Sequence, residues 1–440
     1  MSSKPCHIGI VGAGPSGCYV ADALGRKRPG ARIDIFDRLP TPFGLVRGGV
    51  APDHQGTKNI TRQFERTLGK DGVRFLGNIA VGRDISYEEL KAACDVLVIT
   101  IGALEDRRLG IPGEGLGAVY GSGRFVAWYN GIPEGRELDP VLDGQSLAII
   151  GNGNVALDIA RLLAKTSDEL ASSDLCAHAR AAFEASRIED IWLIGRRGPL
   201  EASFTTAELA EFGDLSRVAT LVDPAQLPEV VSDALGEDQR KLAEKNLEVL
   251  RAYAARGEQG GRPLRLHFVF HAAPLAILGE GRARELVLER TRVVPGQAVT
   301  GGDTFSIRAD TVISAIGYRS APFPGLPFDT LRGVVANVQG RVEPGVYAAG
   351  WCKRGPQGVI PANRADSLAV SELILADLAT REFSGKPGSA LIDSLLAERG
   401  ARPVDFAGWQ RINAAEVAAG HGRPREKLAR LEDLLRVARA

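Results

Sequence analysis

The chain has 440 residues, which is enough for two or three domains that each hold their own core. Its 54 basic and 54 acidic residues cancel, so the overall positive charge typical of nucleic-acid-binding proteins is absent. The five cysteines include no Cys-x-x-Cys pair, which argues against a disulfide framework, a redox dithiol and a metal site.

The start of the chain predicts where the protein resides. A predicted strand begins at His7, which leaves no room for a signal or transit peptide. No apolar run reaches the roughly 18 residues that a membrane-spanning helix needs. Since the cysteines suit a reducing compartment, we expect a cytoplasmic protein that contacts neither a membrane nor nucleic acid.

The first hundred residues predict a strand-turn-helix-strand unit followed by further strands. The expected strands cover 7–11, 32–36, part of 73–81, and 95–101, with helices over 19–24 and after the capping box of Ser86 and Glu89. Residues 39–57 are irregular, and a loop of this length in a compact domain is usually functional.

The same pattern then restarts. The expected elements are a strand over 146–150, a helix over 155–164, a helical insertion over 165–187, a strand over 191–194, a mostly helical stretch over 222–262, strands over 264–270, 285–292, 310–316 and 346–349, and a largely helical C-terminal hundred residues. Two such units predict an α/β fold with two Rossmann-like dinucleotide-binding domains. The strand over 346–349 has no partner sheet nearby in sequence. We therefore expect the second domain, residues 104–319, to be inserted into the first, residues 1–103 plus 320–440.

The first glycine turn predicts an FAD site. Gly12, Gly14 and Gly17 form G-x-G-x-x-G directly between a strand and a helix. The first glycine permits the tight turn, the second lets the backbone approach a pyrophosphate, and the third lets helix and strand pack closely. Asp37 ends the next strand, where a carboxylate can accept ribose hydroxyl bonds. The alternative is a glycine turn that arose by chance.

The second glycine turn predicts NADPH rather than NADH. Gly151, Gly153 and Ala156 form G-x-G-x-x-A, and the following strand ends in Arg196 and Arg197 instead of an acid. Two guanidiniums bind a 2′-phosphate that a carboxylate would repel. The alternative is a solvated basic turn. Two dinucleotide sites imply hydride transfer between nicotinamide and flavin.

Four longer segments carry a family resemblance. Residues 42–54, 151–158, 195–200 and 351–360 resemble the adrenodoxin reductase-like ferredoxin–NADP reductases, and the resemblance covers nearly the whole chain. It implies FAD contacts at Ser16, Asp37, Leu45, Val81, Trp351, Gly358, Val359 and Ile360. It implies NADP contacts at Asn152, Gly153, Asn154, Val155, Arg196, Arg197, Glu208 and Gly358. It also implies that His54 and Glu211 lie near the nicotinamide and the flavin as catalytic residues.

Each of the key side chains also has an ordinary interpretation. His54 can be a loop histidine bonded to backbone, and Glu208 can be a carboxylate that caps the helix after Thr205. Glu211 can be solvated, and Trp351 can be part of a core.

The sequence also departs from the family pattern. Asp37 stands where Glu is frequent, Gln357 where Thr is frequent, and Ala210 where a basic residue is common.

The predicted function is NADPH:ferredoxin oxidoreductase, with a ferredoxin-type iron–sulfur protein as partner. The alternatives are a general NADPH diaphorase or quinone reductase, and a non-catalytic NADP-responsive flavoprotein. Because ferredoxins are usually acidic and the net charge is zero, a local basic patch must attract the partner. The candidates for that patch are Arg187, Arg196, Arg197, Lys353 and Arg354.

Overall fold

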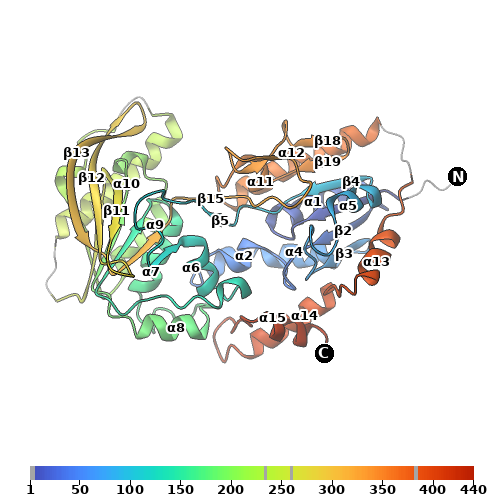
Figure 1. The fold of residues 1–440 in the computed structure, drawn as a ribbon, viewed down its shortest axis with the longest axis horizontal. Coiled ribbons are helices and arrows are strands. Elements are labelled where there is room, and N and C mark those ends of the chain that lie inside the picture. The colour runs from blue at the N-terminus through green and yellow to red at the C-terminus, as the bar shows by residue number, and fades with distance from the viewer. Residues whose placement is uncertain (1–4, 232–234, 258–260, 381–384) are drawn as a thin grey trace. The chain divides into compact units, whose positions relative to one another are not determined.

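The computed structural model describes residues 5–231, 235–257, 261–380 and 385–440, which form two compact units (Figure 1). Unit 1 comprises Met1–Glu105, Asn130–Arg136 and Tyr318–Ala440, and unit 2 comprises Asp106–Tyr129 and Glu137–Gly317. Each unit contains a six-stranded sheet with parallel strands, and unit 2 lies in sequence inside unit 1. The α/β fold with one Rossmann-like domain inserted into another is therefore confirmed. Among the described helices, none is both long and apolar enough to cross a membrane.

One short segment departs from the expected division at 103/104 and 319/320. Asn130–Arg136 groups with unit 1 although both its neighbours in sequence belong to unit 2. Its contacts explain this: Glu134 pairs with Arg38, the Lys427 ammonium donates to Asn130 Oδ1 at 3.0 Å, and Ile132 packs against Gly48. No local sequence pattern signals such long-range contacts.

The sheet of unit 1 has the order β18-β19-β4-β1-β2-β3. Its strands are β1 (His7–Val11), β2 (Arg32–Phe36), β3 (Val73–Leu76), β4 (Val96–Ile99), β18 (Arg341–Glu343) and β19 (Val346–Ala348). The pair β4 and β19 is parallel, which gives the late strand the distant partner that it lacks in sequence. The inner strands are buried on both faces, as their continuous apolar runs require.

Helices cover both faces of this sheet. They are α1 (Pro15–Lys27), α2 (Leu45–Gly48), α3 (Gln55–Lys58), α4 (Thr61–Leu68), α5 (Tyr87–Ala93), α11 (Trp351–Arg354), α12 (Ile360–Ala379), α13 (Ser389–Glu398), α14 (Phe406–Ala418) and α15 (Leu431–Ala438). The helix α1 packs against α12, and α5 begins at the predicted capping box. The loop over 39–57 contains the two short helices α2 and α3. The first is held by a buried ion pair between Arg47 and Glu416 at 2.5 Å.

The main sheet of unit 2 is parallel, with the order β6-β14-β7-β8-β10-β9. Its strands are β6 (Val119–Gly121), β7 (Ser146–Ile150), β8 (Asp190–Ile194), β9 (Val218–Val222), β10 (Leu264–Val269) and β14 (Thr311–Ser314). Its helices are α6 (Ser122–Tyr129), α7 (Asn154–Ala164), α8 (Ala177–Glu184), α9 (Thr206–Ala210) and α10 (Glu237–Arg256). An antiparallel sheet of β11 (Ala272–Leu278), β12 (Glu285–Val294) and β13 (Gln297–Arg308) packs on it through a shared apolar cluster.

The remaining strands form two small two-stranded sheets. The strand β5 (Glu105–Asp106) pairs with β15 (Tyr318–Arg319), and β16 (Phe328–Asp329) pairs with β17 (Val334–Val335). The expected helical insertion over 165–187 contains one regular helix, α8, and the rest of it is turns and irregular backbone. The strands β6, β9, β11 and β13 lie in stretches where no strand was expected.

Candidate functional site

The first glycine turn has the geometry of a dinucleotide turn. Gly12 has φ +112°, and a Cβ atom there would lie 2.5 Å from the Thr100 carbonyl oxygen. A Cβ atom on Gly17 would overlap the Gly12 carbonyl oxygen, so this glycine lets α1 pack on β1. At Gly14 the nearest atom to a Cβ would be Gly44 Cα at 3.9 Å, which leaves open space beside the backbone.

The beginning of α1 is available to an anion. No side chain caps it, so the first N–H groups of this 13-residue helix have no side-chain acceptor among the described residues. Gly44 lies against Gly14, which places Leu45 and the start of α2 beside the turn.

Asp37 stands at the end of β2 next to this turn. Its two carboxylate oxygens accept the backbone N–H groups of Ala13 and Leu39, each at 3.0 Å. Burial raises the pKa of the Asp37 carboxyl, and these two hydrogen bonds partly offset the effect. Each oxygen keeps one lone pair, so the carboxylate can brace the turn and still accept a hydroxyl.

A second part of unit 1 comes to the same place from far along the chain. Gly350 has φ +77°, and a Cβ atom on it would overlap Ser16 Oγ, so the end of β19 lies against the start of α1. Trp351 follows, and its indole Nε1 donates to the Gly358 carbonyl at 3.2 Å. The structure thus groups Ser16, Trp351 and Gly358, together with Val359 and Ile360 at the start of α12.

Two predicted residues of unit 1 are less directly connected to this group. Val81 forms an isolated bridge with Ile85 and packs against the apolar cluster beneath β4, and no described contact joins it to the turn. His54 precedes α3, is half-buried, and donates its backbone N–H to the Ala51 carbonyl at 3.0 Å.

The second glycine turn follows β7 in unit 2. Gly151 has φ +137°, and a Cβ atom there would overlap the Ala315 carbonyl oxygen. No side chain caps α7, which begins at Asn154. The loop before α9 holds the turn: Ser203 donates its backbone N–H to the Asn152 carbonyl, and Thr205 donates its own to Asn154 Oδ1, both at 2.8 Å.

Arg196 and Arg197 follow β8 beside this turn. Both are exposed, and neither side chain has a hydrogen-bond or ion-pair partner among the described residues. Gly195 before them makes room for Asn152, because a Cβ atom there would overlap the Asn152 amide. Two free guanidiniums therefore stand at the strand end where a dinucleotide carries its ribose substituent.

One residue at the centre of the site in unit 2 is missing from the predicted site residues. Arg161 on α7 is completely buried and contacts three carboxylates (2.7 Å to Asp158, 2.6 Å to Glu208 and 3.1 Å to Glu211). The two glutamates come from α9 and the turn that follows it. The Thr205 hydroxyl caps α9 by accepting the backbone N–H of Glu208. The Glu208 carboxylate does not complete a capping box and binds Arg161. The paired spacing of Asp158 with Arg161 and of Glu208 with Glu211 is the only sequence signal of this cluster.

The candidate docking cations do not form one patch. Arg187 precedes β8 whereas Arg196 and Arg197 follow it, and a five-residue strand spans about 17 Å. Lys353 pairs with Asp366 at 2.7 Å, and Arg354 binds Asn363 at 2.7 Å, so these two cations stabilise unit 1 internally.

Residues 6–189, which include both glycine turns, match the pyridine nucleotide-disulphide oxidoreductase family. The chain is 41% identical to the NADPH-ferredoxin reductase FprA of Mycobacterium leprae, with 98% of each chain covered. It is 40% identical to the human mitochondrial NADPH:adrenodoxin oxidoreductase, over 99% of this chain and 92% of that protein. The solved structure of Mycobacterium tuberculosis FprA in complex with NADPH matches with a TM-score of 0.94 at 39% identity, over 99% of this chain and 100% of that one.

The chain therefore belongs to the family of NADPH-ferredoxin and NADPH:adrenodoxin reductases, and the resemblance seen in its sequence motifs is confirmed.

Proposed function

We propose that this chain is an FAD-dependent NADPH:ferredoxin oxidoreductase. The observation that carries the proposal is the presence of two uncapped, glycine-built helix starts, each after a parallel strand of a separate sheet, one of them beside two free arginines. When bound, FAD supplies the chemistry, since it accepts a hydride from NADPH and releases the two electrons singly to an iron–sulfur protein. The five cysteines are free and buried, which excludes a dithiol that would serve a disulfide reductase.

Unit 1 is the proposed FAD domain. The open backbone at Gly14 and the start of α1 fit a pyrophosphate, and Asp37 accepts ribose hydroxyls. Ser16, Leu45 and Val81 are proposed contacts, as are Trp351 and the backbone of Gly358, Val359 and Ile360. The contact of Gly350 with Ser16 supports this group, because it brings the segment after β19 to the glycine turn.

Unit 2 is the proposed NADP domain. Arg196 and Arg197 bind the 2′-phosphate, because they are the exposed guanidiniums at the end of β8. The backbone from Asn152 to Val155 and the start of α7 bind the pyrophosphate. Glu208 and Gly358 are further proposed NADP contacts.

Two side chains are proposed to act at the reacting groups. His54 holds or relays a proton near neutral pH, which an imidazole can do without a large change in its environment. The Glu211 carboxylate is fixed by Arg161 at 3.1 Å while its side chain stays 37% exposed, so it can accept a hydrogen bond from a nicotinamide-side donor. Fixing such an acceptor in advance avoids the cost of ordering it when NADPH binds.

Two assays on the purified protein distinguish this function from its alternatives. Rapid mixing with NADPH should bleach the flavin absorbance, and an absence of bleaching would indicate a non-catalytic NADP-responsive flavoprotein. Cytochrome c reduction should depend on added ferredoxin. Equal rates with and without ferredoxin would indicate a general diaphorase or quinone reductase.

The partner class is a ferredoxin-type iron–sulfur protein, and we propose that the reaction takes place in the cytoplasm. Five buried free cysteines support a reducing compartment. The net charge of zero gives no support to nucleic acid as a partner.

A further inference from the structure

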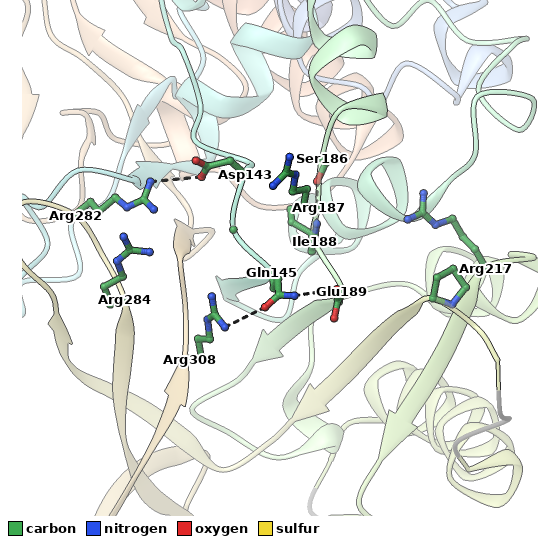
Figure 2. A pocket seen from close by; sticks show the side chains of 12 residues that line it. Asp143, Gln145, Ser186, Arg187, Ile188, Glu189, Arg217, Arg282, Arg284 and Arg308 are labelled. Carbon is green, nitrogen blue, oxygen red and sulfur yellow. Dashed lines mark hydrogen bonds and ion pairs between the residues drawn. The ribbon is translucent and has the colours of Figure 1, made fainter.

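Unit 2 contains a pocket of about 560 Å³ at the edge of its sheet where the parallel strands begin (Figure 2). Residues 143–145 before β7 and 186–189 before β8 line it, as do Arg217 and Pro263 at the starts of β9 and β10. Arg282, Arg284 and Arg308 line it from the antiparallel sheet. The proposed NADP turn follows the opposite end of β7, about 17 Å away along a five-residue strand, so the pocket is a separate site.

The lining is strongly positive in a chain whose net charge is zero. Five of the twelve lining residues are arginines, whereas the lining carboxylates are Asp143 and Glu189. Asp310 lies behind the wall and pairs with Arg284 and Arg308, so counting it leaves an excess of two positive charges, and Asp143 pairs with Arg282 at 3.4 Å. Guanidiniums that converge from separate segments repel one another, and a bound anion removes that repulsion.

Two of these arginines have unused donors. Within the described residues the Arg187 side chain has no hydrogen-bond or ion-pair partner. The Nε atom of Arg217 is buried and also lacks a partner. Buried N–H groups in native proteins are nearly always bonded, so the unpartnered Arg217 Nε, together with the exposed Arg187 guanidinium, supports a ligand that supplies acceptors in this pocket.

The opposite wall is held in place before any ligand arrives. Asp310 is 2% exposed, and its carboxylate accepts Arg308 Nε at 3.0 Å and Arg284 Nη1 at 3.3 Å. The backbone N–H groups of Gln145 and Ser146 bind the same carboxylate. A guanidinium has five N–H donors, and Arg284 uses one of them here, so most of its donors remain available.

We propose that this pocket binds a small organic or inorganic anion that carries two or more phosphate or carboxylate groups. The planar fork of arginine matches both groups through paired hydrogen bonds. The arginines come from the loop before β8, the start of β9 and the antiparallel sheet, so an anion with a single charged group cannot satisfy them together. The volume of about 560 Å³ also exceeds what one phosphate fills.

The test is calorimetric titration of the flavin-loaded enzyme with pyrophosphate and, separately, with citrate. Saturating NADP⁺ keeps the proposed dinucleotide site filled, and acetate at matched ionic strength serves as the monovalent reference. At least one of the two multivalent anions should bind with one-to-one stoichiometry, and at least tenfold more tightly than acetate. Tighter binding of pyrophosphate assigns the site to phosphates, and tighter binding of citrate assigns it to carboxylates.

A double variant tests whether the anion binds in the arginine pocket. Arg187→Gln with Arg217→Gln removes two side chains that have no ion-pair partner among the residues that the structure describes, so folding should be retained, and affinity should fall at least tenfold. Arg292→Gln, an exposed arginine on β12 outside the pocket, is the matched control and should bind like the wild type.

Three results would each overturn the proposal: no saturable binding of either anion, equal affinity in the double variant, or loss of binding when NADP⁺ is added. A change confined to the KM for ferredoxin, with no small-anion binding, would instead identify a protein-docking surface and also overturn it.

Discussion

Arg161→Met tests the buried cluster most directly. The substitution keeps a long unbranched side chain but removes the guanidinium that three carboxylates share at 2.6 to 3.1 Å. Removing one partner of a buried ion pair typically costs about 3–5 kcal/mol, because the other charge stays buried. Asp158 and Glu208 are only 13% and 17% exposed, so they would remain largely buried without the guanidinium. Glu211 is 37% exposed and can be rehydrated, so we expect a cost at the lower end of this range.

A loss of about 3 kcal/mol corresponds to a fall of roughly 6–12 °C in the unfolding temperature of a domain of this size. Function should fall as well, because the carboxylates beside the second glycine turn lose their fixed positions. Each charge-assisted hydrogen bond that NADPH loses corresponds to about 1.5–3 kcal/mol, or tenfold or more in the apparent affinity. Thermal unfolding and stopped-flow flavin bleaching over a range of NADPH concentrations measure the two effects.

Two controls separate the buried cluster from a general effect of losing a charge. Arg161→Lys keeps a positive charge and should recover part of both losses. Arg240→Met makes the same chemical change at an exposed pair, 3.7 Å from Glu244, and should cost less than about 1 kcal/mol. If Arg161→Met unfolds at the wild-type temperature and bleaches with the wild-type NADPH dependence, the reasoning about the cluster is refuted.

Four further predictions concern the cofactors, the partner and pH. Denatured protein should release FAD, and Gly17→Ala should be purified largely without flavin because the new Cβ overlaps the Gly12 carbonyl oxygen; release of FMN would contradict the assignment of unit 1. Arg196→Ala with Arg197→Ala should weaken NADPH by about 1.5–3 kcal/mol per lost bond and leave NADH little changed, whereas equal losses would show that these arginines do not recognise the 2′-phosphate. The ferredoxin-dependent rate at subsaturating ferredoxin should fall with salt more steeply than ferricyanide reduction, since the Debye length shrinks from about 10 Å to about 3 Å between 0.1 and 1 M; parallel salt curves would exclude electrostatic docking. Glu89→Gln should lower stability at pH 7 and have little effect near pH 2. The Arg399 guanidinium lowers the pKa of Glu89 to about 2, below its unfolded value of about 4.3. The resulting stabilisation is therefore present above about pH 4.3 and is lost as the pH falls toward 2. A destabilisation that is the same at both pH values would contradict this last prediction.

The amino-acid sequence by itself determined the features that depend on local backbone geometry. Both glycine turns are required by the chain itself, because Gly12 and Gly151 have positive φ and no room for a Cβ atom. Buried parallel strands carry continuous apolar runs, and for this reason β1, β2 and β7 begin and end where the sequence predicts.

Polar strands could not be predicted in the same way. The strand β13 is exposed along most of its length and has no apolar alternation, so it becomes a strand only through its antiparallel pairing with β12. The segment Asn130–Arg136 likewise joins unit 1 through contacts with residues that are distant in sequence.

The candidate site also combines features that the sequence predicts with features that only the tertiary structure creates. The motifs specify the turns and the two free arginines after β8, because these features follow directly from their own strands. Arg161 one turn after Asp158 has the pattern of an ordinary exposed helical ion pair. Only the tertiary structure decides its role, because α9 and the following turn cover α7, bury the guanidinium and bring Glu208 and Glu211 to it. The arginine pocket arises in the same way, since its five guanidiniums come from segments that share no sequence pattern and meet only where separate strands begin and end at one edge of the sheet.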